Sequence, residues 1–268
     1  MQDGFSRFDV FRLTHLMQQF DGIGLSKIQG ASLLNRVDTK YILGLDQLCV
    51  ILPRVINDYR ALTINDVRLH AYQTLYFDTR AFSFYQQHHN GIASRYKVRA
   101  RKYMDSNLAF FEVKHRTNQR RTVKSRLPID DLITHLDGEL INFTQSHAPC
   151  DAAALEPKLW NEYLRMTLVS KDRPERVTLD VNLRYRWGES VSLLPGIVIV
   201  EVKQAHRTQS AAFIQQMRRL NIRPMSYSKY AAGVYSLYGS VKANNFKPQR
   251  QRVHKVMQEA MDHDRFVD

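Results

Sequence analysis

The stretch Arg95-Tyr96-Lys97-Val98-Arg99-Ala100-Arg101-Lys102-Tyr103-Met104 alternates between two kinds of side chain over ten residues. Successive side chains of a β-strand point to opposite faces of the sheet. One face of this strand would therefore be basic, with Arg95, Lys97, Arg99 and Arg101, while the other would be mostly apolar. The pattern predicts a strand that separates a charged face from a packed one.

The same alternation extends to other parts of the chain. It predicts strands at Leu33 to Leu45, Ala71 to Thr79, Leu108 to Arg116, Thr122 to Leu127, Tyr163 to Ser170, Arg176 to Arg186 and Ile197 to Lys203. Helical spacing predicts helices at Phe5 to Phe20, Asp46 to Tyr59, Arg80 to His89, Ser210 to Leu220 and Ser226 to Tyr238. The stretch from Asp131 to Glu156 is expected to form a helix and a loop outside the sheet. Because most strands follow one another directly, the fold class is α+β, mainly antiparallel β.

The charged face is rich in arginine and lysine. It gathers Arg36, Asp38, Lys40, Arg95, Lys97, Arg99, Arg101, Glu112, Lys114, Arg116, Lys124, Arg126, Arg165, Arg176, Asp180, Arg184, Arg186, Glu201 and Lys203. One interpretation is the solvated side of an open sheet. However, like charges on neighbouring strands repel by about 0.2–1 kcal/mol per opposed pair, so the pattern needs a compensating anion. The alternative is a closed barrel with helices outside and a charged interior that holds a polyanion.

Composition supports a folded protein with an anionic partner. The 268 residues include 39 Lys plus Arg against 26 Asp plus Glu, a net charge of +13, and 44% of residues are hydrophobic. The only cysteines, Cys49 and Cys150, form no CxxC pair, which excludes a disulfide scaffold and a zinc finger. The N-terminus lacks the pattern of a signal peptide, so a reducing, cytoplasmic location is expected. We divide the chain into an N-terminal helix and loop (1–32), a main domain (33–238) and a basic polar tail (239–268), expected to be frayed or a loosely held helix.

Eight ordered motifs resemble a known family. They are Arg36-Val37-Asp38-Thr39-Lys40-Tyr41, Thr74-Leu75-Tyr76-Phe77-Asp78-Thr79, Arg95 to Arg101, Phe111-Glu112-Val113-Lys114, Thr122-Val123-Lys124-Ser125-Arg126, Arg176-Val177-Thr178-Leu179-Asp180, Val200-Glu201-Val202-Lys203 and Ser226-Tyr227-Ser228-Lys229-Tyr230. Together they resemble the VTC domain, the polyphosphate polymerase branch of the CYTH-like triphosphate tunnel metalloenzymes.

The resemblance implies a closed eight-stranded barrel that encloses a basic tunnel and synthesises inorganic polyphosphate from ATP, with release of ADP. A divalent metal, Mn²⁺ or Mg²⁺, would be the cofactor, held by Glu201, with Glu112 as a second candidate ligand. The catalytic residues would be Arg99, Arg101, Arg176 and Glu201. The phosphate-binding residues would be Lys40, Lys97, Lys114, Lys124, Arg126, Arg165, Lys203 and Lys229, the last carried by a helix that plugs one end of the tunnel.

Alternatives remain at this stage. The hydrolase and cyclase branch of this superfamily carries Glu-x-Glu-x-Lys on its first strand, whereas this chain has Arg36, Asp38 and Lys40. The loss of one carboxylate favours the polymerase over a tripolyphosphate or nucleoside triphosphate hydrolase. A non-catalytic polyphosphate sensor would use the same binding residues. For Glu112, Asp38 and Asp180, pairing with neighbouring cations is the expectation. Nucleic-acid binding is not expected, and a membrane-protein partner cannot be inferred from the sequence.

Overall fold

The computed structural model describes residues 7–29, 37–119 and 121–264. Its strands are β1 (Asp21–Ile23), β2 (Val37–Gly44), β3 (Tyr59–Leu62), β4 (His70–Thr79), β5 (Arg95–Tyr103), β6 (Leu108–Arg116), β7 (Thr122–Ile129), β8 (Leu155–Ser170), β9 (Glu175–Trp187), β10 (Ser190–Leu194) and β11 (Ile197–Gln204). Its α-helices are α1 (Arg7–Gln18), α2 (Leu25–Gln29), α3 (Leu45–Ile51), α4 (Ser83–His89), α5 (Gly138–His147), α6 (Ala212–Arg219), α7 (Lys229–Leu237) and α8 (Lys247–Asp264). Short 3₁₀ turns are η1 (Leu52–Val55), η2 (Ala152–Ala154) and η3 (Asn244–Phe246).

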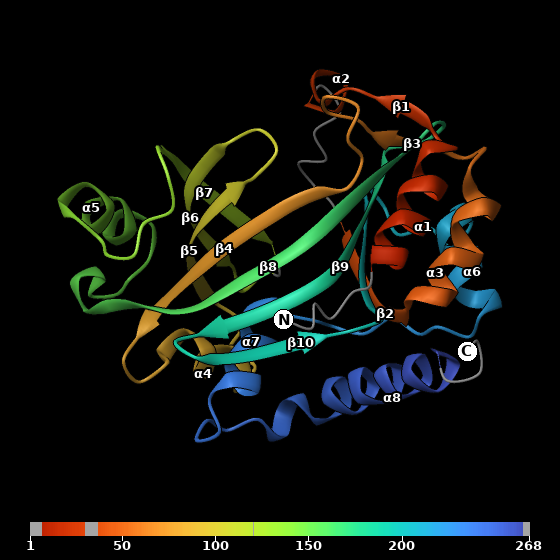
Figure 1. Cartoon of the computed structure of the whole chain (residues 1–268). Coiled ribbons are helices and arrows are strands. Elements are labelled where there is room, and N and C mark those ends of the chain that lie inside the picture. The colour runs from red at the N-terminus through yellow and green to blue at the C-terminus, as the bar shows by residue number, and fades with distance from the viewer. Residues whose placement is uncertain (1–6, 30–36, 120, 265–268) are drawn as a thin grey trace.

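All the strands belong to one sheet. Its main path runs β2-β11-β9-β8-β4-β5-β6-β7, and every neighbouring pair along this path is antiparallel. β1, β3 and β10 are side branches of the path. Figure 1 shows β4, β8 and β9 crossing the front of the molecule, with β5, β6 and β7 on one side and β2 on the other. The predicted α+β class with a mainly antiparallel sheet is confirmed.

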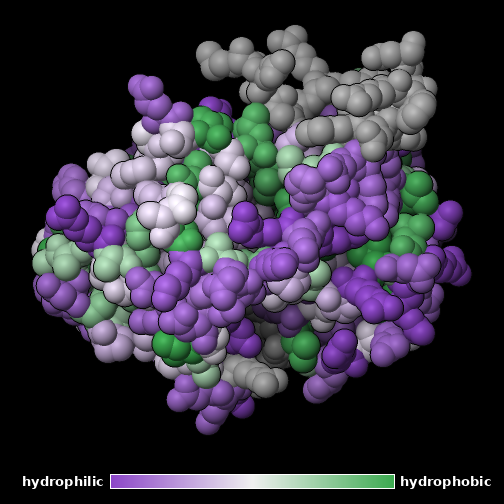
Figure 2. Space-filling view, turned by 90° about the horizontal axis from the view of Figure 1, so that it is seen from below, coloured by the Kyte–Doolittle hydropathy of each residue, from purple (hydrophilic) through white to green (hydrophobic). Residues whose placement is uncertain are grey.

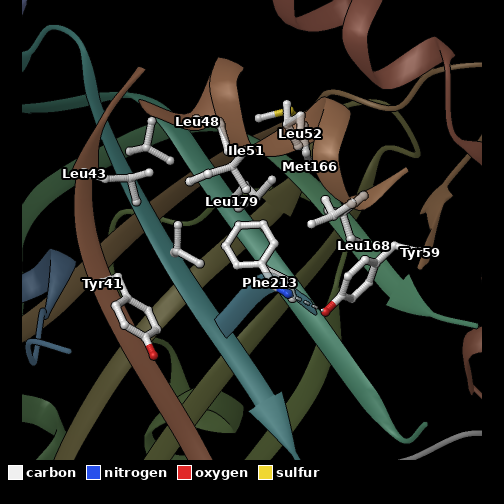
Figure 3. Close-up of a cluster of buried hydrophobic side chains, with 14 of the residues drawn as sticks. Tyr41, Leu43, Leu48, Ile51, Leu52, Tyr59, Met166, Leu168, Leu179 and Phe213 are labelled. Atoms are coloured by element: carbon white, nitrogen blue, oxygen red, sulfur yellow. Dashed lines mark hydrogen bonds between the residues drawn. The ribbon is translucent and has the colours of Figure 1, made fainter. Parts of the chain in front are cut away.

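Helices cover the outer face of the sheet in two places. Near β9 and β11, helices α1, α3 and α6 bury a cluster that includes Leu48, Leu179 and Phe213 (Figures 1 and 3). Within this cluster the Tyr59 hydroxyl accepts a hydrogen bond of 3.2 Å from the Phe213 backbone N–H. Near β5 and β6, a second cluster includes Phe111, and Leu140 of α5 joins it. Most of the apolar sets predicted from the alternation pack under these helices. The prediction is wrong at the end of β9, because the register shifts at Asn182 and turns Leu183 and Tyr185 to the inner face and Arg184 and Arg186 to the outer one.

Helix α7 instead packs against the inner face, the side of the sheet that carries the charged residues. Tyr230 and Val234 of α7 share a buried cluster with Leu159 and Tyr185 of the sheet. A Cβ atom added at Gly233 would lie 2.9 Å from the side chains of both Leu159 and Tyr185, so only glycine permits this close approach. The approach fixes the start of α7 over the charged part of the inner face.

The prediction of a closed barrel is wrong, because β2 and β7 end the path without pairing with each other over the described residues. Other groups occupy the outer edge of β2. The Lys40 carbonyl accepts a hydrogen bond of 2.8 Å from the Met225 backbone N–H. The Ile42 carbonyl accepts from the Arg252 guanidinium at 3.3 Å. These contacts satisfy the edge carbonyls that pairing with β7 would have used.

The basic tail is a packed helix and not the frayed or loosely held segment we expected. Val253 and Val256 of α8 are buried against the cluster around α7, while Lys247, Arg250 and Lys255 are exposed. From below, the side on which α8 lies, the surface is largely hydrophilic (Figures 1 and 2). Over the residues that the structure describes, no helix combines the length and hydropathy needed to cross a membrane.

Candidate functional site

The charged residues of the inner face are largely shielded from solvent. Glu112 is 0% exposed, Asp180 2% and Arg101 8%. The sheet also curls: Lys40 on β2 and Lys97 on β5, which are far apart in the strand order, donate hydrogen bonds to the neighbouring residues Tyr227 and Ser228 just before α7. Burial, followed by the nearby charge of Lys40 on β2, lowers the pKa of Lys114 on β6 to about 7. Charges on strands far apart in the sheet order therefore face one another across the inner side.

A first ion cluster lies on β5, β6 and β7. The Arg99 guanidinium contacts a Glu112 carboxylate oxygen at 2.6 Å, and the Lys124 ammonium contacts the other oxygen at 3.1 Å. Burial acts to raise the pKa of Glu112, but Arg99, Arg101 and Lys124 outweigh it and hold that pKa well below its usual range. Glu112 is thus an ionised partner of cations, which is the pairing expected from the sequence.

A second cluster joins the sheet to α7. Arg165 on β8 grips Asp180 on β9 with two hydrogen bonds, of 2.5 Å and 2.7 Å. The Lys229 ammonium, at the start of α7, donates to the same carboxylate. Burial opposes ionisation of Asp180, yet these two cations keep its pKa low. The predicted phosphate ligands Arg165 and Lys229 are therefore held in place by one carboxylate.

The third cluster is centred on Glu201 of β11. Its carboxylate contacts the Lys203 ammonium directly and the Lys40 ammonium at 3.6 Å. Lys40 also donates a hydrogen bond of 2.9 Å to the Tyr227 carbonyl, just before α7. Asp38 pairs in register with Lys203, whereas Arg36 lies outside the described residues. The predicted metal ligand is thus surrounded by lysines.

Several predicted phosphate-binding residues have no carboxylate partner among the described residues. Among the described residues, Lys97, Arg101 and Lys114 form no ion pair within 4 Å. Lys97 donates to the Ser228 hydroxyl at 2.8 Å, and Arg101 donates to the Thr74 hydroxyl at 3.3 Å. Burial and neighbouring cations, first Lys114 and then Lys40, push the pKa of Lys97 well below its usual value. The inner face therefore holds more positive charge than its carboxylates balance.

The two remaining predicted residues lie at the margins of this group. Arg126 on β7 is exposed, and its guanidinium lies 4.8 Å from the centre of the Phe110 ring. Arg176 on β9 is opposite Lys203 on β11 in the strand register. All the predicted site residues thus lie on the inner face or on α7 beside it, while their roles remain predictions.

Our interpretation of the sequence missed the contribution of β4. Tyr72, Thr74 and Tyr76 lie opposite Tyr103, Arg101 and Arg99 in the register, so they share the inner face. Splitting Ala71 to Thr79 into its two alternating sets would have found them. We also missed Asp78, which is 0% exposed and accepts hydrogen bonds from the Tyr230 hydroxyl and from the Phe84 and Tyr85 backbone N–H groups. Asp78 therefore ties α4 and α7 to the sheet.

The buried lysines predict an unusual dependence of stability on pH. Burial lowers the pKa of Lys229 to about 8, as it lowers that of Lys114 to about 7. Between these values and about pH 10.4, the unfolded chain binds more protons than the folded one, so the free energy of unfolding should rise with pH. We expect the melting temperature in anion-free buffer to rise from pH 7 to pH 9.5. Tripolyphosphate should raise it more at pH 7 than at pH 9.5.

Thermal melts with and without tripolyphosphate at both pH values would check this expectation. A melting temperature that falls steadily from pH 7 to pH 9.5 without the anion would contradict it. Lys102→Met offers a matched control, because Lys102 pairs with Asp131 on the outer face and its loss should not change the slope.

The protein is thus an α+β protein built on a curled antiparallel sheet, whose inner face is rich in cationic side chains and partly shielded from solvent. The chain belongs to the VTC domain family, whose model matches residues 35–238. This match confirms the resemblance inferred from the eight motifs. No curated protein matches the sequence as a relative.

Solved structures give more distant likenesses. A candidate adenylate cyclase of Bacillus halodurans shares 10% identity at a TM-score of 0.48, covering 72% of this chain and 94% of that one. A candidate adenylyl cyclase of Hippeastrum, described as having a dominant triphosphatase activity, shares 12% identity at 0.49, covering 77% and 97%. The protein PH1819 of Pyrococcus horikoshii shares 11% identity at 0.44, covering 75% and 98%. These likenesses are too distant to indicate what this chain does.

Proposed function

We propose that this protein transfers phosphoryl groups along its inner face, and that it lengthens inorganic polyphosphate from ATP with release of ADP. The observation that carries the proposal is that three buried or partly buried basic side chains, Lys97, Arg101 and Lys114, have no carboxylate within 4 Å among the described residues. A chain of phosphates would supply the missing negative charge along several strands at once. Arginine forks and lysine ammonium groups both suit phosphate oxygens.

The proposed step is an in-line displacement. A terminal oxygen of the polyphosphate chain attacks the γ-phosphorus of ATP, a new P–O bond forms, and the bond to the β–γ bridging oxygen breaks. The electron pair of that bond leaves with ADP, and the chain gains one phosphate. Such a step needs alignment and charge neutralisation more than covalent help from the protein.

The chain's own residues would divide this work. Arg99, Arg101 and Arg176 would hold the transferred phosphoryl group, and Lys40, Lys114, Lys124 and Arg126 the acceptor chain. The clusters support this assignment because Glu112 fixes the orientation of Arg99, and Asp180 fixes those of Arg165 and Lys229. Held in place before the substrate arrives, these cations would lose little freedom on binding.

A divalent metal fits this site only together with phosphate. The described residues contain no group of three His, Cys, Asp or Glu side chains placed to hold a metal. A single carboxylate combined with substrate phosphates is a donor set that Mg²⁺ uses, and Glu201 would provide that carboxylate. The cation would supply further neutralisation of the phosphate charge.

Hydrolysis of triphosphates is the second candidate. A hydrolase must activate water, and a carboxylate free to take a proton is the usual means. On this inner face Glu112, Asp180 and Glu201 are each engaged by two cations, and the pKa values of all three are lowered. This arrangement favours a phosphate oxygen as the nucleophile, which is already ionised.

The reaction product decides between these functions. We expect purified protein, incubated with ATP and Mn²⁺, to yield a ladder of polyphosphate on a polyacrylamide gel and ADP in equal amount to the phosphate incorporated. ADP and orthophosphate without any polyphosphate would establish the hydrolase. Binding of ATP and tripolyphosphate without turnover, under either Mn²⁺ or Mg²⁺, would establish a sensor.

A further inference from the structure

An aromatic patch lies at one end of the inner face and is not used by the proposed phosphate chemistry. We define it as Tyr72, Tyr103, Leu108 and Phe110. In the register Tyr72 and Leu108 both lie opposite Tyr103, and Phe110 lies opposite Arg101, so all four share the inner face. The Tyr72 and Tyr103 rings are 4.9 Å apart, and the Tyr103 and Phe110 rings 6.0 Å.

The aromatic patch is open to solvent, unlike the aromatic cluster at the other end. Leu108 is 52% exposed, and the three rings of the patch are only partly buried. At the end covered by α7, Tyr185 is 0% and Tyr230 1% exposed, within a packed core. Within the patch, Tyr163 stacks on the Tyr72 ring and the Arg126 guanidinium lies over the Phe110 ring. A planar ligand group would therefore stack mainly on Tyr103, and the rings beside α7 are closed to it.

Along strand β5, the aromatic patch directly follows the row of inward-facing cations. Along β5 the inward side chains are Lys97, Arg99, Arg101 and then Tyr103. Two residues of a strand span about 7 Å, roughly the reach of one ribose. The Arg101 guanidinium lies 5.7 Å from the centre of the Tyr72 ring. A phosphate on Arg101 would thus leave an attached nucleoside over the rings.

We propose that the aromatic patch binds the base of a nucleoside triphosphate whose phosphates lie on Arg101 and the cations beyond it. This inference rests on the proposed function and adds the site that selects a nucleotide over an inorganic triphosphate. Every base offers a flat face for stacking, so ATP and GTP should bind with similar affinity. The γ-phosphate then points toward the start of α7, where Lys40 and Lys97 meet.

Isothermal titration of ATP and of tripolyphosphate, without metal, tests the inference. We expect Tyr103→Ala to weaken ATP binding by about tenfold and to change tripolyphosphate binding by less than twofold. Tyr103→Phe keeps the ring and should restore the affinity for ATP that Tyr103→Ala loses. Equal weakening of both ligands would mean that the rings only position Arg101, and an unchanged affinity for ATP would also overturn the inference.

A second measurement uses the unmodified protein and does not depend on the folding of a variant. Fluorescence of 2-aminopurine riboside triphosphate should be quenched on binding, because the base stacks on aromatic rings, and excess tripolyphosphate should restore it. Binding without quenching would exclude stacking. Failure of the wild type to bind tripolyphosphate would instead contradict the proposed function itself.

Discussion

Arg101→Ala should weaken tripolyphosphate binding by about 30- to 150-fold, the loss expected when about 2–3 kcal/mol of charge-assisted hydrogen bonding is removed. Arg101 is 8% exposed and has no ion pair within 4 Å among the described residues, so its charge is available to a ligand. A phosphate clamp serves the bound substrate and the transition state alike. The kcat/KM for ATP should therefore fall by at least the same factor as the affinity for tripolyphosphate.

The matched control is Arg186→Ala on the outer face. Arg186 lies over the Trp160 ring, 5.0 Å from its centre, and pairs with Glu162, away from the inner face. Titration calorimetry should give this variant the affinity of the wild type. If both arginine variants lose affinity equally, the anion binds to the general positive charge of the protein and not to the inner face. Thermal melts would show whether Arg101→Ala remains folded.

Glu201→Gln should separate metal-dependent turnover from binding. The substitution keeps the size of the side chain but removes the charge that a divalent cation needs, so turnover with Mn²⁺ or Mg²⁺ should fall on the order of 100-fold or more. Binding of tripolyphosphate without metal should be unchanged or tighter, because Lys40 and Lys203 lose a competing carboxylate.

The control here is Glu162→Gln, a carboxylate of β8 that pairs with Arg186 on the outer face. Steady-state kinetics across a metal titration, together with calorimetry, would separate the two effects. Equal losses of turnover and of metal-free binding in Glu201→Gln would show that Glu201 only positions its lysines. Normal turnover of Glu201→Gln at every metal concentration would show that Glu201 is not a metal ligand.

Strand alternation predicted the two faces of the sheet because burial enforces it. A shift of one residue in Arg95–Tyr103 or Glu175–Trp187 would move every apolar side chain into the charged side. The charged positions of Arg95–Tyr103 therefore followed from period two alone. Those of Glu175–Trp187 did so only as far as Asn182, where the register shifts and turns Arg184 and Arg186 to the outer face. The side branches β1, β3 and β10 are only three to five residues long, too short to show a period.

The alternation of side chains does not predict whether the two edge strands of the sheet, β2 and β7, pair to close a barrel. The edge of β2 is satisfied by Met225 and Arg252, which are 185 and 210 residues from their partners Lys40 and Ile42 along the chain. Nothing local in the sequence marks these contacts. Likewise β8 begins at Leu155, inside the stretch from Asp131 to Glu156 that we expected to lie outside the sheet. The faces on which most of the predicted site residues lie could be predicted, because these residues lie inside strands, whereas the roles of the residues remain predictions.

The most direct test of the central claim is a crystal structure of the protein with tripolyphosphate bound and no metal added. The account predicts the phosphate chain along the inner face, with its oxygens within hydrogen-bond distance of Lys97 and Arg101 and one end near the start of α7. Phosphate density found only on the exposed basic residues of α8, such as Lys247 and Arg250, with the inner face unchanged, would contradict it.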